Sequence, residues 1–139
     1  MRLVGILGGT FDPVHLGHLR TASELLDELP LDEIRFMLCG SPPHRRPPCA
    51  SPGVRWEMLS ASVHDQPGLV ADGRELQRDG PSYTVDTLTS MRQEFPDRSL
   101  CLIVGMDAFT GLSTWHRWEE ILDIAHIVVA HRPGWKAPD

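Results

Sequence analysis

The chain has 139 residues, of which 41% are hydrophobic and 23% charged, a composition typical of one globular domain spanning residues 1–139. No apolar run approaches the 18 residues that a membrane span needs, and the apolar start is too short for a secretory signal peptide. The net charge of −6 argues against extended nucleic acid as a partner, because a phosphate backbone requires a broad basic surface.

The three cysteines predict a reducing compartment. Cys39, Cys49 and Cys101 are too few and too scattered for a disulfide framework, and none forms a C-x-x-C pair. A cytoplasmic protein is therefore expected. Composition leaves the oligomeric state open, including a homo-oligomer.

Strands and helices alternate along the chain. Continuous apolar runs predict strands buried on both faces, and apolar residues at helical spacing predict amphipathic helices. In chain order we predict a strand over 2–7, a helix over 17–29, a strand over 34–39, an exposed loop over 40–53, a helix over 54–63, a strand over 69–71, a helix over 84–95, a strand over 100–104, a helix over 118–124 and a strand over 127–130. This alternation predicts an α/β Rossmann-like open parallel sheet with helices on both faces, whose ligands bind beyond the carboxyl ends of the strands.

The helical spacing also predicts which faces are buried. The inward residues are expected to be Leu19, Ala22, Leu26 and Leu29 in the first helix, Val54, Met58, Ala61 and Val63 in the second, and Val85, Leu88, Met91 and Phe95 in the third. Ser82 or Thr84 is the expected N-cap of the third helix.

The segment after the first strand, residues 8–18, reads GGTFDPVHLGH. Gly8 and Gly9 allow a close approach to a ligand and conformations closed to other residues. His15 and His18 are three residues apart at the expected start of a helix, whose free N–H groups attract anions. Two imidazoles and free amides together predict a phosphate site.

Several alternatives apply to the same segment. Its glycines do not have the G-x-G-x-x-G spacing of a dinucleotide-binding turn, and the G-K-[ST] of a P-loop is missing. The His-x-x-His pair could bind a metal, although no third ligand is evident nearby in sequence. A glycine-rich turn with two surface histidines is the purely structural alternative.

The string G-G-T-F-D-P-V-H-x-G-H resembles the H-x-G-H nucleotidyltransferases, and among them the bacterial nicotinate-mononucleotide adenylyltransferase family. The resemblance implies adenylyl transfer from ATP to nicotinate mononucleotide, giving nicotinate adenine dinucleotide and pyrophosphate in NAD synthesis. It implies catalytic roles for His15 and His18, and ATP-binding roles for these two histidines with Gly8, Gly9, Thr10 and Phe11. Mg²⁺ is expected to arrive with ATP, held mainly by phosphates and water.

Three later stretches also resemble that family. Pro42-Pro43-His44-Arg45, the S-Y-T-x-x-T-L pattern from Ser82, and the G-x-D-x-x-x-x-L-x-x-W pattern from Gly105 match its motifs. By resemblance, the mononucleotide-binding residues are Thr10, His44, Arg45, Thr84, Trp115 and His116, and the further ATP-binding residues are Gly105, Asp107 and Arg132. Many relatives carry tyrosine at the position of His116, so a backbone role is expected there.

One departure from the family concerns the end of the chain. Relatives usually continue into a Ser/Thr-rich turn ending in Ile-Arg that clamps the ATP phosphates, whereas this sequence stops at Asp139. The chain is therefore expected to be C-terminally incomplete relative to the family. The alternatives left open are transfer to another phosphate such as phosphopantetheine, and a non-catalytic nucleotide-binding module or truncated fragment.

Overall fold

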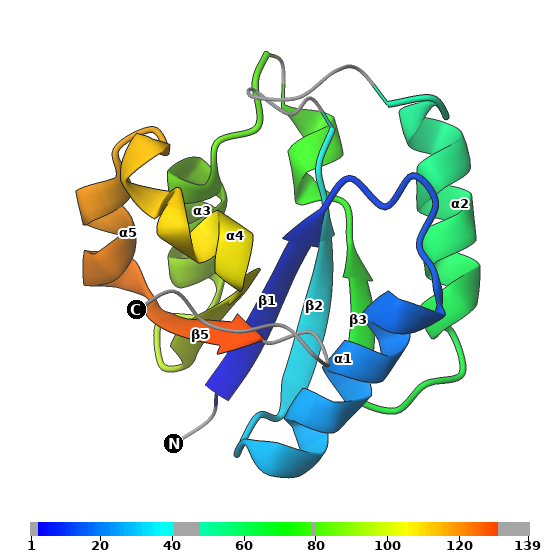
Figure 1. Cartoon of the computed structure of the whole chain (residues 1–139), viewed down its shortest axis with the longest axis horizontal. Helices are drawn as coiled ribbons and strands as arrows, with labels where there is room; N and C mark the ends of the chain where they lie inside the picture. The colour runs from blue at the N-terminus through cyan, green and yellow to red at the C-terminus, as the bar shows by residue number, and fades with distance from the viewer. Residues whose placement is uncertain (1–2, 41–47, 79, 131–139) are drawn as a thin grey trace.

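The computed structural model describes residues 3–40, 48–78 and 80–130. Strands and helices alternate as expected (Figure 1). The elements are β1 (Leu3–Gly9), α1 (Leu16–Glu28), β2 (Glu33–Leu38), α2 (Pro52–Val63), β3 (Leu69–Asp72), the 3-10 helix η1 (Arg74–Gln77), α3 (Thr84–Glu94), β4 (Ser99–Gly105), α4 (Met106–Thr110), the 3-10 helix η2 (Leu112–Thr114), α5 (Trp118–Ile124) and β5 (His126–Ala130).

The strands of the described residues form one five-stranded parallel sheet in the order β3-β2-β1-β4-β5. The strand β1 lies at the centre of this order, between β2 and β4. Gly9 pairs with Leu38 of β2, and Leu7 pairs with Ile103 of β4, so that Gly9 and Gly105 end side by side. The predicted fold class is confirmed, and three strand ends meet where a ligand is expected.

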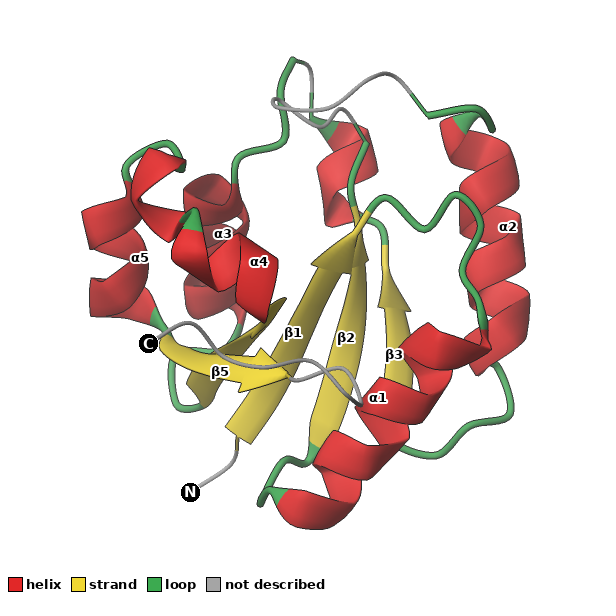
Figure 2. Ribbon diagram, viewed as in Figure 1, coloured by secondary structure: helices red, strands yellow, loops and turns green. Residues whose placement is uncertain are grey.

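Helices cover both faces of the sheet (Figure 2). Ala22 of α1 and Leu59 of α2 pack on one face, in a core cluster that includes Phe36. Leu88 of α3 and Ile121 of α5 pack on the other face, in a second cluster. Because both faces are covered, the strands are mostly apolar, which is the pattern that made them recognisable in the sequence.

The predicted inward face of α2 is wrong for three of its four residues, and only Val63 is buried as predicted. Val54 and Met58 are 47% and 43% exposed, and Ala61 is exposed as well. The buried residues of α2 are Arg55, Leu59 and Val63. The apolar spacing does not predict the buried face of α2, because a charged residue, Arg55, takes the first inward position. Its side chain donates hydrogen bonds to main-chain carbonyl groups there.

The apolar stripe of α3 is confirmed, but its predicted N-cap is wrong. Val85, Leu88 and Met91 are buried, and Phe95 packs against the same cluster from just beyond the helix. The N-cap is Tyr83, and no side chain caps the start of the helix. The remaining predicted bounds agree with the structure to within two residues. The helix α2 begins two residues early, at Pro52, just after its capping residue Ser51.

Three short elements carry too few residues for a helical pattern to show: η1, α4 and η2. All three follow carboxyl ends of strands or lie in the connections beyond them. Within the described ranges no helix has the length and apolar character needed to span a membrane.

Candidate functional site

The two histidines of the β1–α1 connection hold the start of α1. The main-chain N–H of Gly17 donates to Nδ1 of His15 at 3.1 Å, and the main-chain N–H of His15 donates to Nδ1 of His18 at 3.0 Å. Their rings stack with centroids 3.8 Å apart and an interplanar angle of 27°. The structure therefore brings His15 and His18 together, as the spacing predicted.

These two hydrogen bonds determine which imidazole nitrogens face outward as donors. A nitrogen that accepts a hydrogen bond needs its lone pair, so in this arrangement each neutral ring carries its proton on Nε2. An Nε2–H group of this kind can donate to an anion. The expectation of free amides at the helix start is corrected, because the Gly17 N–H already has an imidazole partner.

Gly17 is required by the position of the His15 ring. A Cβ built on Gly17 would lie 2.9 Å from Cε1 and 3.0 Å from Nδ1 of His15, which is closer than Cβ atoms approach other heavy atoms. Any other residue would push the imidazole away from the helix start. This contact supplies a physical reason for the glycine in the H-x-G-H motif.

Phe11 supports the histidines from below. Its ring is 4% exposed, meets the His18 ring edge-on at 5.0 Å and lies 5.6 Å from the Phe36 ring. Its φ of 46° is the strained conformation of this connection, whereas Gly8 and Gly9 continue β1. The expectation that those two glycines adopt conformations closed to other residues is therefore wrong. Gly9 instead makes room for Phe11, whose ring atoms would lie 3.1 Å from a Cβ there.

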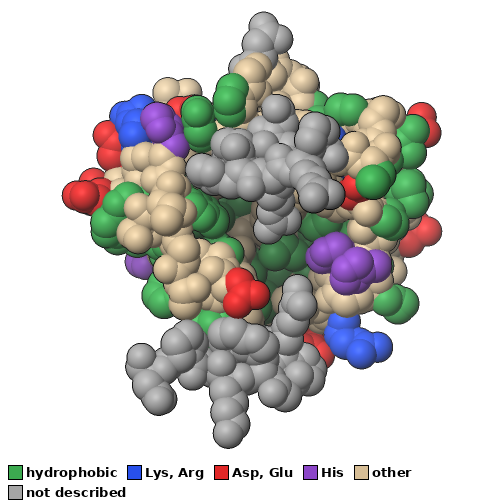
Figure 3. All heavy atoms as spheres, turned by 45° about the horizontal axis from the view of Figure 1, so that its top comes forward, with side chains coloured by type: hydrophobic (Ala, Val, Ile, Leu, Met, Phe, Trp, Pro, Cys, Tyr) green, Lys and Arg blue, Asp and Glu red, His purple; other side chains and the backbone are tan. Residues whose placement is uncertain are grey.

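Open space lies over the ends of β1 and β4. A Cβ built on Gly8 or Gly105 would meet no atom of the described chain within 4 Å, and both glycines are exposed. The helix α4 begins directly after Gly105, and Asp107 is exposed in its first turn. Figure 3 looks toward this end of the sheet and shows histidine side chains exposed beside a hollow with an apolar floor. The arrangement leaves room for a polar ligand beside the two imidazoles.

Asp12 joins the β1–α1 connection to the segment before α2. Its carboxylate accepts hydrogen bonds from the main-chain N–H groups of Cys49, at 2.7 Å, and Ala50, at 3.0 Å. These two bonds hold the pKa of Asp12 below its usual value of 3.8. The carboxylate thus acts as a structural tie.

Arg55 is a residue of this region that the sequence analysis missed. Its side chain is fully buried and donates to the carbonyl oxygens of Thr10, at 2.9 Å, and Cys39, at 2.7 Å. Thr10, a predicted binding residue, is thereby held through its main chain. Nothing in the local pattern distinguishes Arg55 from the other arginines, because its partners are main-chain atoms distant in sequence.

The predicted mononucleotide-binding residues at the start of α3 and before α5 come together. The rings of Tyr83 and His116 stack at 4.1 Å with an interplanar angle of 26°, next to Thr84 and Trp115 in the chain. Trp115 is half-buried and packs against the core cluster below, as does Tyr83. No side chain caps the first main-chain N–H groups of α3. Arg117, the residue after His116, has a positive φ of 52°.

A polar network lies between η1 and α3. The buried carboxylate of Glu75 accepts from the Thr87 hydroxyl, which also receives a hydrogen bond from Arg78 at 2.7 Å. Burial raises the pKa of Glu75 above its usual 4.5. Nearby, burial alone would raise the pKa of Asp72, but hydrogen bonds from Arg74 and Arg35 hold it below its usual value.

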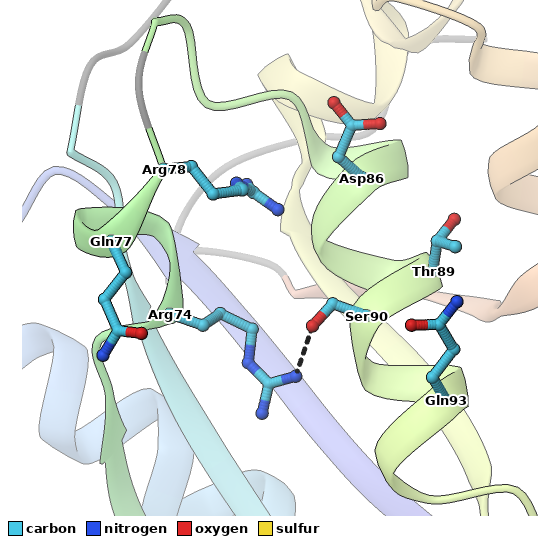
Figure 4. Close-up of a pocket in the computed structure, with 7 residues that line it drawn as sticks. All are labelled: Arg74, Gln77, Arg78, Asp86, Thr89, Ser90 and Gln93. Atoms are coloured by element: carbon cyan, nitrogen blue, oxygen red, sulfur yellow. Dashed lines mark hydrogen bonds between the residues drawn. The ribbon is translucent and has the colours of Figure 1, made fainter.

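A hollow of about 440 Å³ opens beside this network (Figure 4). Arg74 and Arg78 point into it from the η1 side, and Asp86 and Gln93 border it from α3. Arg74 is already engaged there, by Ser90 and by the carboxylates of Asp72 and Glu94. Neither histidine of the candidate site lines this hollow.

Three predicted site residues, His44, Arg45 and Arg132, lie outside the described residues. Within the described residues, no group of three histidine, cysteine, aspartate or glutamate side chains could hold a metal ion. His15 and His18 would supply only two metal ligands, and Nδ1 of each ring already accepts a main-chain N–H.

Comparison with known proteins gives a consistent match. The family model described as cytidylyltransferase-like matches residues 6–139. A protein of Aeromonas hydrophila described as a "probable nicotinate-nucleotide adenylyltransferase" is 53% identical over 98% of this chain and 63% of its own length. A protein of Methylococcus capsulatus with the same description is 55% identical over 96% of this chain and 64% of its own.

Among solved structures, the chain is similar to the Plasmodium falciparum nicotinic acid mononucleotide adenylyltransferase complexed with NaAD. The TM-score is 0.78 at 15% identity, over 98% of this chain and 78% of that one, which supports the fold. The chain spans just under two thirds of the length of the two curated relatives it matches.

Proposed function

Since the chain belongs to the cytidylyltransferase-like family, we propose that it transfers an adenylyl group from ATP to nicotinate mononucleotide, forming nicotinate adenine dinucleotide and pyrophosphate in NAD synthesis. The observation that carries the proposal is the stacked pair of His15 and His18 at the start of α1, beside the end of β1, with Nδ1 of each ring accepting a main-chain N–H. The descriptions of the relatives at 53% and 55% identity support this substrate pair over other phosphates.

The proposed reaction is a direct in-line displacement. A phosphate oxygen of the mononucleotide attacks the α-phosphorus of ATP, forming a new P–O bond. The bond between that phosphorus and the oxygen bridging to the β-phosphorus breaks, and pyrophosphate leaves with the electron pair. The attacking phosphate is already ionised, so no strong general base is needed. Catalysis then consists of positioning and of stabilising the charge that develops on phosphoryl oxygens.

His15 and His18 are assigned to the ATP phosphates through Nε2–H. Gly8, Gly9 and Gly105 allow the nucleotide close to the strand ends, and Asp107 and Arg132 are assigned to the nucleotide beside them. Thr10 and Phe11 are assigned to the same ATP-binding segment, with the Phe11 ring buried. Nucleotidyltransferases generally use a divalent metal with ATP, and Mg²⁺ bound by phosphates and water would neutralise part of their charge.

The mononucleotide is assigned to the other side of the site, where the segments at the start of α3 and before α5 meet. Thr84 and the backbone of His116 lie next to the Tyr83–His116 stack, and Trp115 beside them offers an aromatic surface for the pyridine ring. His44 and Arg45, with the hydroxyl of Thr10, are assigned to its phosphate. Within the described residues, the cysteines at positions 39, 49 and 101 form no disulfide, which is compatible with the reducing cytoplasm proposed for the protein.

A substrate panel tests the proposal. Pyrophosphate release is measured with ATP and, in turn, nicotinate mononucleotide, nicotinamide mononucleotide and phosphopantetheine, and binding of each is measured by calorimetry. The proposal predicts the highest turnover with nicotinate mononucleotide. Binding of both substrates without pyrophosphate release would contradict the catalytic assignment, and preference for phosphopantetheine would contradict the substrate assignment.

The role of the imidazoles is tested by His18→Ala. Loss of one donor to a developing oxyanion is expected to reduce turnover about 100- to 1,000-fold. The matched control is His64→Ala, because the His64 side chain is 80% exposed at the far end of α2. Equal turnover of the His18→Ala variant and the unsubstituted protein would show that His18 has no such role.

A further inference from the structure

Arg55 occupies an unusual position for a charged residue. It is 0% exposed on the inner face of α2, where a helix of this kind normally presents an aliphatic side chain. Its four hydrogen bonds in the described part of the chain all go to main-chain carbonyl oxygens, and none goes to a carboxylate. The Asp12 carboxylate interacts with Arg55 only through its charge, without a hydrogen bond in the described part of the chain. Burying a guanidinium without a directly bonded carboxylate is costly, so its retention at this place calls for a role that an apolar residue could not fill.

The partners of Arg55 come from three separate segments. One is the carbonyl of Thr10, just beyond the end of β1, and two are the carbonyls of Cys39 and Gly40, just beyond the end of β2. The fourth is the carbonyl of Ala50, at 3.2 Å from Nε, in the segment before α2. The carbonyls of Thr10, Cys39 and Gly40 lie past the ends of their strands, so the sheet cannot satisfy them. A planar guanidinium supplies several donors in a fixed geometry.

Asp12 completes the arrangement around Ala50. The N–H of Ala50 donates to the Asp12 carboxylate at 3.0 Å while its carbonyl accepts from Arg55. The main chain of Ala50 is therefore bound by the Asp12 carboxylate at its N–H and by the Arg55 guanidinium at its carbonyl. This arrangement joins the β1–α1 connection, the end of β2 and the start of α2 through the side chains of Arg55 and Asp12.

We propose that Arg55 is a positioning residue that holds the two substrate-binding loops at a fixed separation. This inference rests on the proposed function: Thr10 begins the connection that carries His15 and His18, and Cys39–Gly40 leads directly to His44 and Arg45. One loop is assigned to the ATP phosphates and the other to the mononucleotide phosphate. In-line attack requires the reacting atoms to lie within about 3–3.5 Å, and a displacement of about 1 Å can cost about 100-fold in rate.

Two substitutions separate the shape of the guanidinium from its charge. Arg55→Lys keeps a buried positive charge but removes the planar fork, and Arg55→Met removes both while filling similar space. The matched control is Leu59→Ala, one turn further along the same face of α2, which weakens the core without reaching either loop. Each variant is compared with the unsubstituted protein by amide hydrogen exchange and by steady-state kinetics.

The expected result is a local effect on both loops. In Arg55→Lys, exchange at the amides of residues 8–15, 38–40 and 48–50 should rise by about tenfold or more, as expected for loss of a charge-assisted hydrogen bond, with strand peptides unchanged. The kcat should fall about 100-fold, with a smaller change in KM for either substrate. Leu59→Ala should raise exchange throughout the α2 side of the sheet and leave kcat of the folded protein near that of the unsubstituted protein.

The outcomes separate this inference from the proposed function. Unchanged exchange in both loops of Arg55→Lys, or an equal effect of Leu59→Ala on kcat, would overturn the positioning role. If the unsubstituted protein neither binds nor turns over the substrates, the proposed function fails, and the exchange pattern still decides whether Arg55 holds the loops. Should neither variant fold, NMR of the Arg55 side chain in the unsubstituted protein decides: slowly exchanging, separate Nη–H signals support the role, and a single averaged signal overturns it.

Discussion

At the scale of single residues, the candidate site depends on how two imidazoles are oriented. Each ring uses Nδ1 to accept a main-chain N–H, which places the proton of the neutral ring on Nε2. The hydrogen bonds that Nδ1 of each ring accepts at the start of α1 therefore determine which ring nitrogen carries the proton. Gly17 and Phe11 matter because they hold these rings in place and have no need to touch the ligand themselves.

Gly17→Ala tests this arrangement. The new Cβ would displace the His15 ring, so we expect turnover to fall toward that of His15→Ala, while the better helix propensity of alanine compensates by about 1 kcal/mol for the lost cap. Gly53→Ala is the control, because Gly53 lies in the first turn of α2 and a Cβ there would meet no described atom. Thermal denaturation and pyrophosphate release measure the two effects. Full activity of Gly17→Ala would contradict the inferred role of the His15 ring.

At the scale of elements, the sequence predicted helices and strands better than it predicted the face each helix buries. The regular apolar spacing of α3 gave the right stripe, because its inward residues are all apolar. In α2 the spacing failed, because Arg55 holds an inward position and Val54 and Met58 face solvent. Partners far away in sequence determine such a position, and no local pattern reports them.

Adjacent residues of α2 test the observed face. Leu59 is 0% exposed and Met58 is 43% exposed. We expect Leu59→Ala to lower the free energy of unfolding by about 2–5 kcal/mol, through lost burial and a remaining cavity. Met58→Ala should change it by no more than about 0.5 kcal/mol. Urea denaturation measures both, and similar losses for the two variants would favour the face first expected from the sequence.

The junction of η1 and α3 should make stability depend on pH. Burial raises the pKa of Glu75, so the folded protein keeps this proton to higher pH than the unfolded chain does. The stability linked to Glu75 is thus present below its ordinary pKa of 4.5 and is lost as pH rises through the raised value.

Glu75→Gln removes that titration and can still accept from Thr87. Relative to the unsubstituted protein, the variant should gain stability as pH rises from 4.5 to 8, with urea midpoints as the measurement. Asp65→Asn is a control, because the Asp65 side chain is 92% exposed. A stability difference between Glu75→Gln and the unsubstituted protein that stays constant with pH would contradict the burial-driven shift.

At the scale of the whole molecule, the sheet order explains why motifs distant in sequence form one site. The ends of β2, β1 and β4 lie side by side, so the segments after Leu38, Gly9 and Gly105 meet at one edge. Strand–helix alternation predicted that edge as the binding region. The tie between loops through Arg55 and Asp12 was not predictable, because it consists of side-chain bonds to main-chain atoms about 40 residues away.

The most direct test of the central claim is an NMR titration of the histidine side chains with ATP. Long-range proton–nitrogen spectra report which ring nitrogen is protonated. We predict the Nε2–H form for both His15 and His18 and a shift of both Nε2–H signals as ATP is added. Gly8→Ala, which fills the open space at the end of β1, should keep the Nε2–H form and reduce the ATP-induced shifts. Protons on Nδ1, or imidazole signals that do not move at millimolar ATP, would contradict a phosphate site at these two rings.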